Sequence, residues 1–282
     1  MIRRQEQDDF LLITQHDHAL IAGELAEYFG NEFFEAPQPL ESALTGIRLH
    51  DCGWPLHDNE PTRNKEGLPL DVFETPREIG LKVWNASVDG ATAKDPYAGL
   101  LVSLHVLSLS VFATTQTNFE HEKWDLDNPQ DKFAVTKFQQ SQIQKQDHLR
   151  LKLGLRSDKT MHHSGPPQEG AQKKEDQLNF NFRLLQAMDV MSLALCCTKP
   201  PSRQTQDVFS HPGAAPLRFN LTRNEKDLIV DPWPFSRDQI ELMIPTCRIP
   251  ARAYGSDEDL RAAAKDGASE VLTCRVLPAH LA

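Results

Sequence analysis

The sequence predicts a mainly α fold, a bundle of helices, with a small antiparallel β subdomain at its C-terminal end. Up to about residue 200, apolar side chains recur at the three- and four-residue spacing of helices. Beyond Pro200 the pattern changes to short segments rich in β-branched residues and bounded by Pro, Asn or Gly, which is typical of strands. The expected units are a helical domain over residues 10–200 and a β-rich subdomain over residues 211–282.

Signals at their ends mark the expected helices. The first covers about residues 14–30, with Thr14 as its N-cap and Gly30 as its stop. The second begins at Pro39, a favoured first residue of a helix, and ends near Asp51. The others are expected over residues 76–86, 96–115, 129–153 and 176–197. A polar insertion over about residues 117–175 contains a Pro- and Gly-rich stretch that we interpret as a mobile loop or lid.

Four segments of the C-terminal part are interpreted as strands. They are LRFNLTR (217–223), DLIVDPWPF (227–235), IELMIPTCRI (240–249) and EVLTCRVL (270–277). A short helix over residues 256–266, capped by Ser256, is expected between the last two.

Composition limits the functions that the chain can serve. Lys and Arg number 30 and Asp and Glu 40, so the formal net charge of −10 argues against a nucleic-acid surface over the whole protein. The longest apolar stretch, AGLLVSLHVLSLSVFA, is interrupted by His105 and several serines, so no membrane span is expected. The five cysteines are odd in number and lack CxxC spacing, which indicates free thiols in the cytoplasm.

Several polar residues fall on the apolar faces of the expected helices. His18 shares its face with Ile21 and Leu25, and His50 and Asp51 follow Ile47 at the end of the second helix. On later helices, His105 and Asp189 likewise lie in line with leucines. These side chains are therefore expected to point towards the core.

The buried carboxylates require partners, because an unpaired buried charge costs about 5 kcal/mol or more. Asp189 has no basic residue three or four positions away on its helix. Together with His18, His50 and Asp51 it forms a set of nitrogen and oxygen ligands suited to a divalent transition metal such as Mn, Fe, Co, Ni or Zn. The alternative is a hydrogen-bonded His–Asp network that only fixes the packing of the helices.

The same residues stand in the segments TQHDHALIAG, RLHDCGW and LLQAMDVMSLALC. In order and position they resemble the HD-domain superfamily of metal-dependent phosphohydrolases, and the segments HDCGW, DPYAGLLVSLH and MDVMSLALC resemble a bacterial family with an HDxGW motif within it. The resemblance covers about residues 10–200. It implies a helical core with one divalent metal held by His18, His50, Asp51 and Asp189.

The resemblance also implies a function. The protein would hydrolyse a phosphate ester of a small molecule, with nucleotides among the candidate substrates, through a metal-activated water. Asp51 would orient or deprotonate that water, and His105 would contact the substrate or a metal ligand. Trp54 departs from the pattern, since many members carry Lys at this position; it either fills the core or stacks on a base or sugar.

Two other functions remain open at this point. One is a non-catalytic metal-binding or sensor module of the HD type, which the absence of Lys at position 54 favours. The other is a di-iron oxygenase of the HD type, a class of site that needs about six ligands. The sequence offers no further inward-facing histidine on the 76–86 helix to complete that set.

Overall fold

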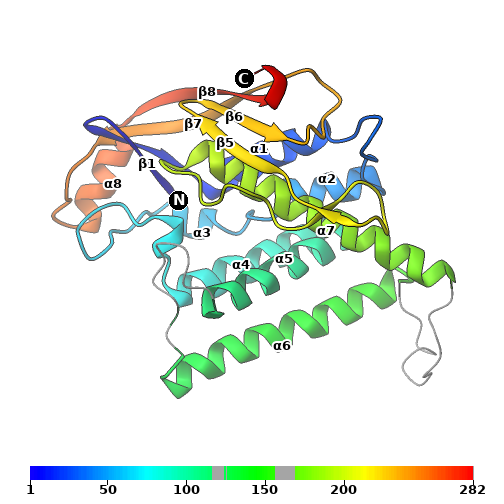
Figure 1. The fold of residues 1–282 in the computed structure, drawn as a ribbon. Helices are drawn as coiled ribbons and strands as arrows, with labels where there is room; N and C mark the ends of the chain where they lie inside the picture. Colours follow the sequence, from blue (N-terminus) through cyan, green and yellow to red (C-terminus); the bar gives the residue numbers. More distant parts are fainter. Residues whose placement is uncertain (116–123, 125, 156–168, 282) are drawn as a thin grey trace.

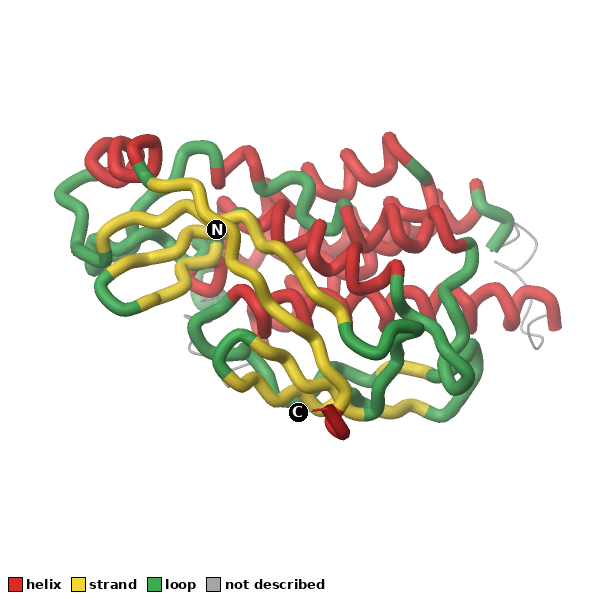
Figure 2. The backbone as a smooth tube through the Cα atoms, turned by 90° about the horizontal axis from the view of Figure 1, so that it is seen from above, coloured by secondary structure: helices red, strands yellow, loops and turns green. Residues whose placement is uncertain are grey.

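Helices stack in layers beneath a curled sheet (Figure 1). The computed structural model describes residues 1–115, 124, 126–155 and 169–281. The sheet lies along one side of the molecule, and Figure 2 shows its strands running obliquely across the helices. Both termini lie on the side of the molecule that carries the sheet, away from helix α6 (Pro129–Lys152).

The sheet has six strands in the order β1-β2-β7-β8-β6-β5. They are β1 (Ile2–Glu6), β2 (Asp9–Ile13), β5 (Asn220–Asn224), β6 (Asp227–Asp231), β7 (Ile240–Pro250) and β8 (Ala268–Pro278). Neighbouring strands are antiparallel except for β6 and β8, which are parallel. Strands β3 (Val208–Phe209) and β4 (Pro216–Leu217) form a separate pair.

The expected helices are present, but the one expected over residues 76–86 extends to Lys94 and the one expected from residue 176 begins at Glu169. A short helix over Pro55–Asp58 was not expected. The helices are α1 (Gln15–Glu27), α2 (Leu40–Arg48), α3 (Pro55–Asp58), α4 (Arg77–Lys94), α5 (Pro96–Thr115), α6 (Pro129–Lys152), α7 (Glu169–Cys196) and α8 (Asp257–Asp266), with 3-10 turns η1 (Val72–Glu74) and η3 (Ala279–Leu281). The expected caps are present, because the side chains of Thr14 and Ser256 accept hydrogen bonds from the backbone N–H groups of Asp17 and Asp259. Of the expected insertion over residues 117–175, residues 117–123, 125 and 156–168 lie outside the described residues.

One hydrophobic core joins the sheet to the helices α1, α2, α5 and α7. In β7, Ile240, Leu242 and Ile244 point inward while the residues between them are exposed, the period-two pattern of a strand with one buried face. A second cluster of buried side chains lies farther from the sheet, between α4, α5 and α6. Helix α5 is long and apolar enough to cross a membrane, but here it is the central helix that contacts α2, α4, α6 and α7.

The expected fold class, mainly α with a small antiparallel β subdomain, is wrong. The chain has an α/β fold, because its large sheet is mixed and is extended by two strands from the N-terminus. Strand β2 pairs with β7, so that Phe10 lies opposite Ile249. The strand β1 has too many polar residues to stand out locally, and its buried Arg4 bonds to a helix end. Pairing between segments this far apart in the chain leaves no local pattern in the sequence.

Two arginines from the sheet bind the C-terminal end of α7. The last carbonyl groups of a helix have no partners within it and need donors from elsewhere. Arg4 on β1 donates through Nη1 to the carbonyl of Leu195 at 2.7 Å. Arg223 on β5 donates to the carbonyl of Ala194 at 3.1 Å and also to those of Cys197 and Thr198. The sheet therefore fixes the end of the helix that carries Asp189.

We expect Arg4→Met to lower the free energy of unfolding by about 1–3 kcal/mol, because it leaves a buried carbonyl group without its donor. The matched control is Arg218→Met. Among the described residues this exposed arginine pairs with Asp207, and its loss should cost less than about 0.5 kcal/mol. Urea titration followed by circular dichroism measures both. Equal losses in the two variants would show that Arg4 does not stabilise the end of α7.

Candidate metal centre

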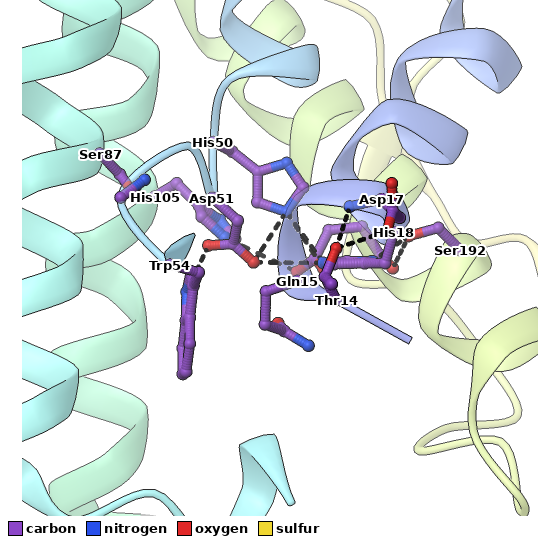
Figure 3. Close-up of polar contacts among 12 residues, drawn as sticks. Thr14, Gln15, Asp17, His18, His50, Asp51, Trp54, Ser87, His105 and Ser192 are labelled. Carbon is purple, nitrogen blue, oxygen red and sulfur yellow. Dashed lines mark hydrogen bonds and ion pairs between the residues drawn. The ribbon is translucent and has the colours of Figure 1, made fainter. Parts of the chain in front are cut away.

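The five residues singled out in the sequence come together between the helices. Figure 3 shows His18, His50, Asp51 and His105, and Asp189 lies within 3.6 Å of all three histidines. His18 lies in the first turn of α1, His50 and Asp51 in the turn after α2, His105 midway along α5 and Asp189 in the last two turns of α7. All five are buried, with exposed fractions between 0% and 8%. Four separate elements thus supply one cluster.

A glycine lets the turn after α2 reach this position. The backbone N–H of Gly53 donates to Ser87 Oγ on α4 at 2.9 Å. A Cβ atom at Gly53 would collide with the Val83 carbonyl oxygen, so no other residue fits here without displacing α4. The glycine of the HDCG segment is therefore explained by the close approach of two backbones.

Hydrogen bonds at Nδ1 fix the protonation of two histidines. The Nδ1 atom of His50 lies 2.7 Å from the Ile47 carbonyl oxygen, which can only accept, so this nitrogen carries the proton. The Nδ1 atom of His18 lies 2.6 Å from Ser192 Oγ, whose own proton is donated to the Asp189 carbonyl at 2.9 Å. In the neutral rings both Nε2 atoms therefore present lone pairs, and these two atoms are 3.3 Å apart.

Carboxylate oxygens complete this group of acceptors. Asp51 Oδ2 lies 3.2 Å from the Nε2 atom of His18 and 3.6 Å from that of His50. Asp189 Oδ1 lies 3.6 Å from both. Two imidazole Nε2 atoms and two carboxylate oxygens thus face a common point, which can hold a proton on His50 or a metal ion.

This geometry fits one divalent cation. Ligand atoms about 2.0–2.2 Å from one ion, at tetrahedral or octahedral angles, lie about 2.8–3.6 Å from one another. The separations here are 3.2, 3.3 and 3.6 Å. Imidazole nitrogen with carboxylate oxygen suits Mn, Fe, Co, Ni or Zn. The two groups of possible ligands, His18–His50–Asp51 and His50–His105–Asp189, share His50, so His18, His50, Asp51 and Asp189 are the residues that would hold such an ion.

The charges in the cluster also favour a cation. Burial lowers the pKa of His50, but Asp51 and Asp189 together outweigh burial and raise this pKa to about 9. Burial raises the pKa of Asp189, yet the neighbouring imidazoles outweigh it and lower the pKa to about 2. The pKa of Asp51 is lowered for the same reason. Both carboxylates stay charged at neutral pH, so a metal ion would replace a proton held between them.

The second oxygen of each carboxylate contacts another residue. Asp51 Oδ1 accepts a hydrogen bond of 3.0 Å from Trp54 Nε1, which fixes the rotation of the carboxylate. Asp189 Oδ2 lies 3.6 Å from His105 Nε2. Burial lowers the pKa of His105 to about 4, so its ring is neutral. No described residue bonds to its Nδ1 atom.

Two contributors to the site were missed in the sequence. Ser192 lies three residues after Asp189 on the same buried face, so its position held a usable signal. Gln15, at the start of α1, lines a cavity next to Asp51 and gave no such signal. Trp54 was interpreted as core packing or a stacking surface, and its bond to Asp51 was not foreseen.

Fold and site together define an α/β protein with a buried two-histidine, two-aspartate centre suited to a metal ion. Residues 1–251 match the family model described as "Protein of unknown function (DUF3891)", and the chain belongs to this family. Neither a curated protein nor a solved structure matches this chain.

We expect the protein, purified without an affinity tag, to contain about one transition-metal ion per chain, and His50→Ala to lose it because one of four ligands is gone. His148→Ala, which removes an exposed histidine on α6, should leave the metal content unchanged. Elemental analysis by mass spectrometry measures all three proteins. Nearly two ions per chain would contradict a site for a single ion. No metal even after reconstitution would show that these residues do not form a metal site.

Trp54→Phe should weaken metal binding about 10- to 100-fold, because phenylalanine fills the same space but cannot hold the Asp51 carboxylate. Trp84→Phe is the matched control, since Trp84 packs against Trp124 and Phe138 instead. Competition with a chromogenic chelator gives the affinities. If the two variants bind metal equally well, the bond from Trp54 does not orient Asp51.

Proposed function

We propose that the protein is a metal-dependent hydrolase that cleaves a phosphate ester with a water molecule. The observation that carries the proposal is the pair of imidazole Nε2 atoms 3.3 Å apart, flanked by two charged carboxylates. A divalent ion held there would polarise a phosphoryl oxygen and lower the pKa of a water molecule. The resemblance to the HD-domain superfamily supports the choice of a phosphate ester, with nucleotides among the candidate substrates.

Asp51 is the proposed residue that orients the attacking water. Its Oδ1 atom is held by Trp54, and its Oδ2 atom faces the two histidines. Its lowered pKa keeps it ionised, so it can accept a hydrogen bond from the water. His105, neutral and lining the same cavity, is the proposed contact to the substrate.

The proposal includes a cytoplasmic protein that acts on a small phosphorylated molecule. All five cysteines are free thiols, which supports a reducing compartment. We propose a single metal, because a di-iron oxygenase needs about six ligands whereas the groups that the described residues form contain five.

A second candidate is a non-catalytic metal-binding or sensor module. Two observations favour it. Trp54 stands where many members of the superfamily carry Lys, and no Lys or Arg is among the described residues that line the cavity at the centre. In such a module the ion would only stabilise the packing of four elements around it.

Asp51→Asn separates the two functions. For a hydrolase, we expect turnover of 4-nitrophenyl phosphate or bis(4-nitrophenyl) phosphate to fall at least about 100-fold with the far-ultraviolet circular dichroism unchanged. Asp89→Asn, at an exposed ion pair of α4 with Lys145, is the control and should keep full turnover. Metal content is measured in parallel. A wild-type protein that holds its ion and cleaves neither ester supports the non-catalytic module.

A further inference from the structure

An aromatic cavity opens directly beside the metal centre. Its volume is about 140 Å³, and Asp51, His105 and Asp189 form part of its wall. Most of the remaining wall consists of aromatic rings and aliphatic side chains. The rings belong to Trp54, Phe73, Trp84, Phe112 and Trp124. A group bound in this cavity would therefore lie next to the metal centre.

The rings are held in place before any ligand binds. The indole N–H of Trp54 is bonded to Asp51, and that of Trp124 to the Thr75 carbonyl at 3.2 Å. Trp84 and Trp124 pack with ring centroids 5.2 Å apart. A Cβ atom at Gly80 would lie 2.8 Å from the Trp124 ring, so this glycine allows the ring its position. The indoles of Trp54 and Trp124 offer the cavity their apolar surfaces, while their N–H groups are already used.

The lining suits an uncharged ligand. No Lys or Arg occurs among the described residues of the wall, and the acids at its inner end belong to the metal centre. An anionic group that left water for this cavity would find no cation to replace its hydration. The charged part of a substrate must therefore stay at the centre, and an uncharged part must occupy the cavity.

A buried amide in the wall has a donor atom without a partner among the described residues. Gln15 is 2% exposed and lines the cavity, and its Nε2 atom bonds to no described residue. Its backbone N–H is fixed by Asp58 Oδ2 at 2.7 Å. Figure 3 shows the side chains of Gln15 and Trp54 extending on the same side of the histidines. A buried donor of this kind is favourable only when an acceptor, such as a ligand oxygen, reaches it.

We infer that the cavity binds an uncharged aromatic ring of the substrate, joined directly to the ester oxygen, and that the Gln15 amide donates to an oxygen atom of this substrate. The ring would lie between Trp54 and Trp84, since flat apolar groups gain most from aromatic walls. Nucleotides fit this position less well, because their sugar separates the base from the phosphate. The inference rests on the proposed function in one respect, that the bond cleaved is a phosphate ester. The binding of the ring does not depend on that function.

Calorimetric titration of the metal-loaded and the metal-free protein with 2-naphthol, cyclohexanol and adenosine tests the inference. We expect 2-naphthol to bind at least ten times more tightly than the other two. Ala113→Phe fills the cavity and should weaken 2-naphthol at least tenfold, whereas Val111→Phe, on the exposed face of the same helix, should not. Gly80→Ala is a second blocking variant, because alanine favours helix α4 while its Cβ displaces Trp124.

Two outcomes would overturn the inference. One is 2-naphthol binding that is equal in the wild type and in both blocking variants, with folding and metal content unchanged. The other is cyclohexanol or adenosine binding as tightly as 2-naphthol. Failure of the proposed function is seen separately: 2-naphthol binding that both blocking variants weaken, in a protein that cleaves no ester, supports the cavity and contradicts the hydrolase.

Discussion

Two imidazole lone pairs that face each other inside the protein are the constraint on which the remaining structure depends. Each ring is held by its Nδ1 hydrogen bond, so neither can turn its N–H group towards the other. With two carboxylates alongside, the arrangement needs a positive charge at its centre, either a proton on His50 or a metal ion. The packing of α1, α2, α5 and α7 brings these groups together, so the four helices must keep their positions relative to one another.

The sheet contributes to the centre without supplying a ligand. Its inner face packs on α1 and α7, which carry His18 and Asp189. Arg4 and Arg223 extend from two separated strands to the same helix end, so α7 is bonded at its C-terminus to the sheet that also covers it. A helix carrying a buried carboxylate gains from such fixation, because small displacements change ligand distances.

The sequence predicted most helices and the burial of the polar side chains that form the centre. It did not predict the mixed sheet. Helical periodicity shows which face of a helix is buried, and this was sufficient for His18, His105 and Asp189. It carries no information about partners far along the chain, so the pairing of β2 with β7 and the parallel pair β6–β8 were not foreseen. The bond from Trp54 to Asp51 depends on side-chain directions within a turn, which spacing alone does not give. The resemblance to the HD-domain superfamily stays a prediction.

The contact between Gly53 and α4 has a consequence for how this protein can diversify. Because the ligand-bearing turn and the helix that carries Trp84 are joined backbone to side chain, that wall of the cavity and the centre form one mechanical unit. Phe73 and Trp124 come from segments outside that unit. Substitutions at Phe73 and Trp124 can therefore change which substrate the cavity binds. The wall that carries Trp84 is more constrained, because α4 also holds the turn with the metal-binding residues.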